Sequence, residues 1–242
     1  MKTKIIAHRG FKSAAPENTL IAFELAKQAG TDGIELDIHR TKDGSLVVMH
    51  DETLDRTSNG RGWIKDITFA ELSKLDAGSW FAPEFKGEKI PLLEDVLIWA
   101  RSQGIFVNIE LKTAIVEYPG LEDAVVDLIN RYGLHDQVLC SSFNHVSLKN
   151  IKQLDPDIQV AILYAQQLVD PWLYAKHIGA VAIHPYFKHI SPEIVMACKK
   201  YKIDINPYTV NEINDLETMM NLGVTSIITD YPDRLASLKL LK

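Results

Sequence analysis

Short β-like runs alternate with helical patterns along almost the whole chain, and no other feature of the sequence restricts the fold as strongly. The predicted strands span residues 4–8, 33–39, 105–112, 137–142, 158–164, 180–184, 204–208 and 225–230. The predicted helices span residues 17–28, 93–102, 121–131, 145–154, 172–177, 192–201, 212–221 and 233–240. Eight β/α repeats in a chain of 242 residues predict an α/β fold, a closed parallel (β/α)8 TIM barrel.

An open, doubly wound sheet is the alternative architecture, because it has the same alternation of strands and helices. Two features favour the barrel. The number of repeats matches it, and nearly every predicted strand ends in polar residues. Because the active sites of such barrels lie at the carboxyl ends of the strands, we expect the functional residues there.

The alternation is interrupted after the second predicted strand. Residues 46–50 form an extra predicted strand, a candidate hairpin partner of the second one. Residues 51–91 are then too long for an ordinary connection. Within them Thr68 and Glu71 match a capping box, which predicts a short helix. We therefore expect one domain over residues 1–242, with a small helical insertion over the barrel mouth; an inert surface loop is the alternative.

Composition restricts the partners. The formal net charge of −6 argues against nucleic acid, whose binding requires a basic surface, although a local site can still hold a phosphate-bearing substrate. Cys140 and Cys198 are the only cysteines and have no metal-ligand spacing, so we expect two buried thiols. No apolar run approaches the ~18 residues of a membrane span, and the first apolar run is too short for a signal peptide. A cytoplasmic protein is the expectation.

Acidic residues occupy one face of the second predicted strand. Strand alternation places Glu35, Asp37 and His39 on one face and aliphatic residues on the other. In a barrel the aliphatic face packs on the helices, so the acids point inward. Two inward carboxylates are costly unless a positive charge neutralises them, and a divalent cation is the obvious candidate.

The third predicted strand repeats this pattern, with Asn108, Glu110 and Lys112 on one face. Glu110 would meet Glu35 and Asp37 across the top of the barrel. Three carboxylates without a thiolate favour a hard cation, Mg²⁺, Ca²⁺ or Mn²⁺. The alternative is an ion-pair network of the same acids with Lys112 and Arg9.

Two histidines stand at strand ends, His8 after the first strand and His50 after the extra one. A pair of imidazoles beside a carboxylate cluster is suited to acid/base work at a phosphodiester, because imidazole exchanges protons near neutral pH. Arg9 and Lys112 could supply positive charge to the phosphate. Gly10 could let the backbone approach it closely.

These motifs together resemble those of the glycerophosphodiester phosphodiesterase family, within the wider group of phosphatidylinositol-phospholipase-C-like phosphodiesterases. The matching residues run in order along nearly the whole chain. They are His8-Arg9-Gly10, Pro16-Glu17-Asn18-Thr19, Glu35-Leu36-Asp37, His50-Asp51, Leu54-Asp55-Arg56-Thr57, Glu110-Leu111-Lys112 and Ile228-Thr229-Asp230-Tyr231-Pro232. Each piece is weak alone, but the ordered set is specific.

The resemblance implies a role for each matching residue. Glu35, Asp37 and Glu110 correspond to the family's metal ligands, and His8 and His50 to its general acid/base pair. Arg9 and Lys112 match positions that contact phosphate, and Glu17 matches a position that supports the site. The implied reaction releases glycerol 3-phosphate and an alcohol. In it the glycerol C2 hydroxyl attacks phosphorus to give a cyclic phosphate, which water then opens.

One departure concerns the alcohol. Where many members have Trp-Thr-Val-Asn, this chain has Tyr208-Thr209-Val210-Asn211, so Tyr208 keeps an aromatic wall but adds a hydroxyl. Lysophospholipase D-type hydrolysis of lipid phosphodiesters is one alternative function, and a catalytically inactive binding barrel is another. An aldolase that uses Lys112 is disfavoured, because acids flank that lysine. The sequence carries no signal for the oligomeric state.

Overall fold

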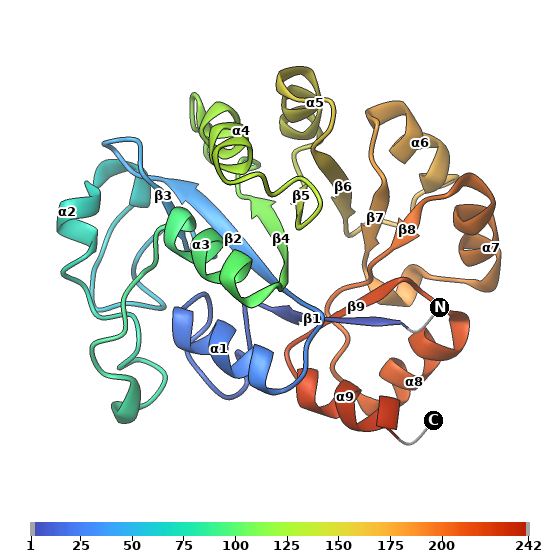
Figure 1. Ribbon diagram of the computed structural model, residues 1–242, viewed down its shortest axis with the longest axis horizontal. Coiled ribbons are helices and arrows are strands. Elements are labelled where there is room, and N and C mark those ends of the chain that lie inside the picture. The colour runs from blue at the N-terminus through green and yellow to red at the C-terminus, as the bar shows by residue number, and fades with distance from the viewer. Residues whose placement is uncertain (1–2, 241–242) are drawn as a thin grey trace.

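The computed structural model describes residues 3–240, in which strands and helices alternate around a barrel (Figure 1). The strands are β1 (Lys4–His8), β2 (Gly33–Arg40), β3 (Leu46–Val48), β4 (Phe106–Leu111), β5 (Val138–Ser142), β6 (Gln159–Tyr164), β7 (Ala182–Pro185), β8 (Asp204–Ile205) and β9 (Ser226–Thr229). Their order is β8-β7-β6-β5-β4-β2-β1-β9, and each is parallel to its neighbours. Only β3 among these strands is antiparallel, and it pairs with β2 alone.

Helices follow the strands and surround the barrel in Figure 1. They are α1 (Leu20–Gln28), α2 (Phe69–Leu72), α3 (Leu93–Gln103), α4 (Leu121–Tyr132), α5 (His145–Leu154), α6 (Pro171–Ile178), α7 (Pro192–Tyr201), α8 (Ile213–Leu222) and α9 (Pro232–Leu240). Among these helices none combines the length and the apolar composition that a bilayer crossing requires.

The two end strands of the order, β8 and β9, lie next to each other and nearly close the barrel. The backbone N–H of Thr225 donates to the Ile205 carbonyl and that of Val210 to the Ile228 carbonyl, each at 3.0 Å. β8 is shorter than the predicted strand at 204–208, although the backbone N–H groups of Asn206 and Tyr208 still donate to the carbonyls of Ile183 and Pro185 on β7, at 3.0 and 3.2 Å. The predicted (β/α)8 barrel is confirmed.

Strand alternation separates the core from the site. On β2 the aliphatic side chains of Ile34, Leu36 and Ile38 are fully buried in the layer between barrel and helices. Glu35 and Asp37 alternate with them and point into the barrel, as predicted. Cys140 and Cys198 are both buried free thiols, in agreement with the sequence.

The chain between β1 and α1 differs from the prediction. Helix α1 begins at Leu20 rather than at residue 17, and Thr19 caps it by accepting a hydrogen bond from the backbone N–H of Ala22. Asn18 lies in the left-handed region, with φ of 58°. Glu17 and Asn18 are therefore loop residues, and their side chains reach the site rather than the helix surface.

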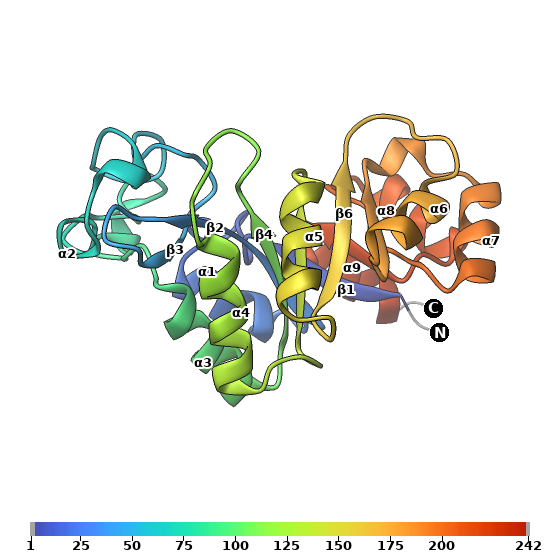
Figure 2. The same ribbon diagram turned by 90° about the horizontal axis from the view of Figure 1, so that it is seen from above.

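The insertion at 51–91 has a small hydrophobic cluster of its own. Its buried members are Val47, Met49, Leu54, Ile64, Leu72, Ala77 and Ile90. The predicted capping box is present: the Thr68 hydroxyl accepts from the backbone N–H of Glu71, and the Glu71 carboxylate accepts from that of Thr68. Figures 1 and 2 show the insertion, in blue-green, beside β2 and β3 at one side of the barrel. The cluster includes Val47 of β3 and so packs the insertion against that strand, while its expected place over the barrel mouth stays a prediction.

Candidate active site

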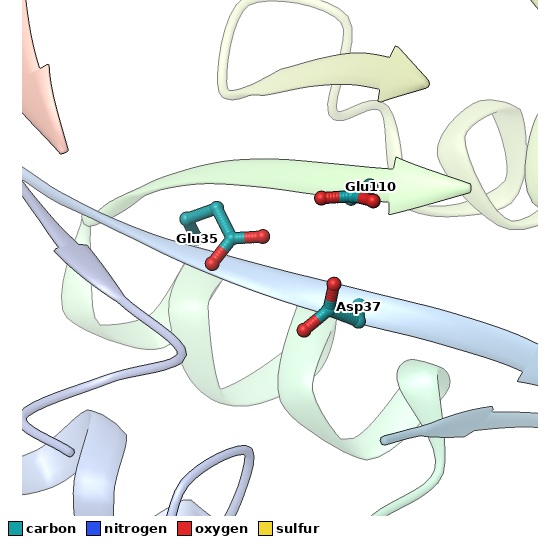
Figure 3. Close-up of side chains that lie close together, drawn as sticks. All are labelled: Glu35, Asp37 and Glu110. Atoms are coloured by element: carbon teal, nitrogen blue, oxygen red, sulfur yellow. The ribbon is translucent and has the colours of Figure 1, made fainter. Parts of the chain in front are cut away.

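Three carboxylates from two neighbouring strands converge inside the barrel (Figure 3). Glu35 and Asp37 come from β2 and Glu110 from β4, and the strand register pairs Asp37 with Glu110 directly. One oxygen of each carboxylate lies within 4.8 Å of one oxygen of the other two. The grouping predicted from strand alternation is thus present in the structure.

Two cations balance these acids in part. The Nε atom of Arg9 lies 3.3 Å from Asp37 Oδ2, and the backbone N–H of Arg9 donates to Glu35 Oε2 at 2.9 Å. The Lys112 Nζ donates to Glu110 Oε1 at 3.0 Å and lies 3.7 Å from Asp37 Oδ1. The ion-pair network that the sequence left open is therefore present, but the three acids still outnumber the two cations.

Burial and the excess negative charge raise the pKa values of two of these three acids. Burial and the neighbouring Asp37 charge raise the pKa of Glu110 to about 7, and the same two causes raise that of Glu35. Burial alone would raise the pKa of Asp37 as well, but Arg9 and Lys112 hold it well below its usual range. An all-oxygen donor set with one charge in excess fits a hard divalent cation, which would replace the proton.

His8 is held by the carboxylate of Asp230, the residue that directly follows the last strand. Its Nδ1 donates to Asp230 Oδ1 at 2.6 Å, and its Nε2 lies 4.0 Å from Glu35 Oε2. Asp230 also accepts from the Asn211 amide at 2.9 Å. Burial lowers the pKa of His8, while the hydrogen bond that His8 donates to Asp230 opposes that change. The imidazole therefore presents a neutral Nε2 toward the acids.

His50 is held in a similar way, by a network that includes the insertion. Its Nδ1 donates to Asp51 Oδ1 at 2.6 Å. Arg56 donates to both oxygens of Asp51, at 2.7 and 2.9 Å, and to both oxygens of Glu17, at 3.0 and 2.8 Å. Glu17 in turn accepts from Arg9 at 2.8 Å. This chain of bonds connects the insertion with the β1–α1 loop and the acids.

Tyr208 follows β8 and stands near Glu110, whose charge adds to burial in raising the pKa of the phenol. Its ring meets that of Phe143 edge to face, with centroids 6.0 Å apart. Its hydroxyl donates to the Tyr164 carbonyl at 3.1 Å. The hydroxyl that distinguishes this tyrosine is thus directed to the main chain of β6, which leaves the ring as the aromatic wall.

Two other buried histidines lie apart from the acid/base pair. His184 is inside the barrel, where its Nε2 accepts from the Asn206 amide at 3.0 Å. Burial lowers the pKa of His184 to about 3 and that of His39 to about 4, so both are neutral. His39 contacts Tyr118 and the main chain of His50, and it is not among the residues that group with the carboxylates.

Sequence reasoning assigned no role to several residues that the structure brings into contact with the site. These are Asn18, which donates to Asp37 Oδ2 at 2.9 Å, and Asp51, Arg56, Asn211 and Asp230. Four of them lie in motifs quoted above for the family resemblance, which was the available signal. Gly10 also has a role in the fold: a Cβ there would lie 2.7 Å from the Ala22 carbonyl carbon, so glycine lets the loop pack on α1.

Comparisons with known proteins agree with this geometry. The model of the glycerophosphoryl diester phosphodiesterase family matches residues 8–234. A protein of Caldanaerobacter subterraneus subsp. tengcongensis named glycerophosphodiester phosphodiesterase is 47% identical over 238 residues, which cover 98% of each chain. A protein of that name from Bacillus altitudinis is 45% identical over 240 residues, again with 98% of each chain covered.

Solved structures with the same architecture lead to the same family. A glycerophosphodiester phosphodiesterase from Agrobacterium tumefaciens has a TM-score of 0.87 at 32% identity, over 97% of this chain and 99% of that one. A phosphodiesterase from Oleispira antarctica, in complex with its product sn-glycerol-3-phosphate, has a TM-score of 0.87 at 30% identity, over 98% and 96% of the two chains. The chain described here belongs to the glycerophosphoryl diester phosphodiesterase family of enzymes.

Proposed function

We propose that this protein hydrolyses glycerophosphodiesters to glycerol 3-phosphate and an alcohol, with one divalent cation as its cofactor. The observation that carries the proposal is the convergence of two carboxylate-paired imidazoles, His8 and His50, on a cluster of three acids, two of them buried. The substrate is a small molecule, and the relative with bound sn-glycerol-3-phosphate supports that product.

Glu35, Asp37 and Glu110 would hold the cation, which is Mg²⁺ or Ca²⁺, with Mn²⁺ as a further possibility. When bound, the cation would polarise phosphoryl oxygens and offset developing negative charge. The Asn18 amide keeps Asp37 in place by donating to its Oδ2. Arg9 and Lys112 lie on the same carboxylates and would also face a bound phosphate.

The two imidazoles would move the protons. In the first step the glycerol C2 hydroxyl attacks phosphorus; one histidine takes its proton, and the other gives a proton to the departing alcohol oxygen. A cyclic phosphate remains. In the second step the histidines exchange roles, so that one takes a proton from water while the other returns a proton to the C2 oxygen. Asp230 and Asp51 fix each ring with Nδ1 protonated, which leaves Nε2 free for this exchange.

Two further residues complete the substrate site in this proposal. Glu17 lies between Arg9 and Arg56 and holds the Arg9 guanidinium toward Asp37. Tyr208 offers its ring, braced by Phe143, as an apolar wall near Glu110.

The test is release of glycerol 3-phosphate from glycerophosphocholine and glycerophosphoethanolamine by the purified protein. Release should stop with EDTA and return with Mg²⁺, Ca²⁺ or Mn²⁺. We expect His8→Ala and His50→Ala each to cut kcat by at least ~100-fold while the metal still binds, because each removes one proton-transfer group. Near-normal turnover in either variant would remove that histidine from the mechanism.

Lysophospholipase D-type hydrolysis is a second candidate, favoured by two exposed aromatic residues of the insertion. Trp63 and Trp80 are 44% and 38% exposed, so both indole rings are accessible to an acyl chain. A lysolipid in the same assay separates the two candidates. Release from the lysolipid alone would support the second one, and no release from any substrate with any metal would indicate an inactive binding barrel.

A further inference from the structure

His39 and Tyr118 form a buried pair beside the proposed acid/base residue His50. His39 is fully buried on β2, two residues after Asp37, and Tyr118 is 6% exposed in the loop between β4 and α4. The Tyr118 hydroxyl lies 2.9 Å from His39 Nδ1, and the two rings meet edge to face with centroids 5.6 Å apart. His39 Nε2 lies 3.1 Å from the backbone carbonyl oxygen of His50.

These contacts assign the hydrogen atoms. A carbonyl oxygen can only accept, so His39 Nε2 carries the hydrogen and donates it to His50. In the neutral ring Nδ1 is then an acceptor, and the Tyr118 hydroxyl donates to it. Tyr118 therefore donates a hydrogen bond to His39, and His39 donates one to the main chain of His50. Both His39 and Tyr118 are buried.

The main chain of His50 needs such support because the β ladder ends just before it. β3 stops at Val48, and the next ladder bond joins the Met49 N–H to the Asp37 carbonyl at 3.0 Å. The Asp51 carboxylate fixes the imidazole of His50 from the other side. The loop that holds Tyr118 follows Lys112 directly, so the same loop connects a proposed phosphate contact with His50.

We propose that His39 and Tyr118 are positioning residues that fix the main chain of His50 and so aim its imidazole at the substrate. The inference rests on the proposed function, in which His50 transfers a proton. The hydrogen bonds of His39 and Tyr118 go to each other and to the main chain of His50 rather than to the carboxylate cluster, so both residues should act on turnover rather than on metal or substrate binding.

The experiment measures kcat, KM and metal affinity of the metal-loaded enzyme for His39→Leu, His39→Gln and Tyr118→Phe. A displaced catalytic group costs up to ~100-fold in rate, so His39→Leu should lower kcat by roughly 10- to 100-fold with KM and metal affinity within about twofold. Tyr118→Phe removes one hydrogen bond and should lower kcat by roughly 3- to 10-fold. His39→Gln keeps an amide donor for the His50 carbonyl and should restore most of the activity.

Tyr132→Phe is the matched control, because its hydroxyl donates to Glu94, a residue of α3 with no role in the site. The decisive comparison repeats each substitution in the His50→Ala background. If His39 and Tyr118 act through His50, neither substitution should change the residual rate by more than about twofold there.

Each result either supports or overturns the positioning role of His39 and Tyr118. Wild-type kcat in both His39→Leu and Tyr118→Phe, with His50→Ala inactive, overturns the positioning role and leaves the proposed function intact. An equal loss of kcat in the wild-type and the His50→Ala backgrounds also overturns the positioning role, because the substitutions would then not act through His50. Full activity of His50→Ala would reject the role of His50 in the proposed function and this inference with it. Should His39→Leu fail to fold, Tyr118→Phe and His39→Gln give the answer.

Discussion

At the residue scale, each imidazole of the site depends on the carboxylate behind it, and Asp230 offers the sharpest test. Its two oxygens accept from different donors, His8 Nδ1 and the Asn211 amide. An asparagine at this position would have to turn its NH₂ group toward one of these donors. We therefore expect Asp230→Asn to lower kcat by roughly 10- to 100-fold, because His8 loses either its partner or its orientation.

The pH dependence of this variant has a definite sign. The Asp230 hydrogen bond and charge raise the pKa of His8 against the effect of burial. Their loss should move the limb of the pH–rate profile that belongs to His8 to lower pH. Asp233→Asn, at the exposed start of α9, is the control. An unchanged profile in Asp230→Asn would show that Asp230 does not govern His8.

A second prediction concerns Arg56, which connects the insertion with the β1–α1 loop. Its guanidinium donates to both oxygens of Asp51 and to both oxygens of Glu17, a geometry that an ammonium group cannot reproduce. Arg56→Lys should therefore lower kcat/KM by roughly tenfold although the charge is kept, since Asp51 and Glu17 lose their common partner. Steady-state kinetics checks this. Arg61→Lys, an exposed arginine of the insertion, should leave kcat/KM unchanged.

The sequence could predict some of these residues and not others. Glu35, Asp37 and Glu110 follow from strand alternation, because side chains two apart on a strand share a face. The partner of His8 does not follow from any local pattern, because Asp230 is 222 residues away along the chain. Only the closing of the barrel, which places β9 beside β1, brings them together.

At the scale of elements, the connection from β1 to α1 fixes the loop that positions Arg9. Gly10 has φ of 79°, and a Cβ there would lie 2.7 to 2.9 Å from three atoms of Ala22 on α1. Gly10→Ala should therefore lose about 2–4 kcal/mol of stability, from the strained φ and from the overlap, and should also lower kcat because Arg9 is displaced.

Gly30→Ala is the matched control for this change. Gly30 has φ of 82° at the end of α1, and a Cβ there would meet nothing within 4 Å. Gly30→Ala should therefore lose only about 1 kcal/mol of stability, which comes from the strained φ alone. Urea unfolding of both variants separates the two contributions, and equal losses would mean that the loop does not need to approach α1 closely.

Element boundaries were the least predictable part of the fold, for reasons that particular residues show. The helical pattern of α1 appeared to extend to Glu17, but Glu17 and Asn18 contact Arg9, Arg56 and Asp37 instead of entering the helix. The insertion was recognisable from its length and its capping box. Its place beside β3 depends on a hydrophobic cluster that no periodic pattern reveals.

At the scale of the whole molecule, the number of β/α repeats and the polar ends of the strands together predicted the barrel rather than an open, doubly wound sheet, which also buries both faces of a parallel sheet. The acids inside that barrel connect the site with the stability of the fold. Burial raises the pKa of Glu110 from its ordinary value of 4.5 to about 7, so the metal-free folded protein keeps a proton that the unfolded chain releases.

The raised pKa of Glu110 should make both protein stability and cation binding depend on pH. Between about pH 4.5 and about pH 7 the unfolded chain ionises at this position and the folded protein does not, so the contribution of Glu110 to the stability of the metal-free protein should fall as the pH rises, whereas the buried neutral His39 and His184 act in the opposite sense. A cation must displace the same proton, so its affinity should rise over that range and level off above it. Saturating Mg²⁺ should therefore raise Tm more at about pH 8 than at about pH 5.5.

Thermal unfolding with and without Mg²⁺ at both pH values checks this, with Glu110→Gln as the control. The glutamine has no proton to release, so the metal-free variant should gain stability relative to the metal-free wild-type protein as the pH rises, and Mg²⁺ should raise its Tm little because one ligand charge is missing. The same gain in Tm at both pH values in the wild-type protein would contradict the linkage. It would mean either that the cation does not bind at Glu110 or that the three acids are already ionised when it arrives.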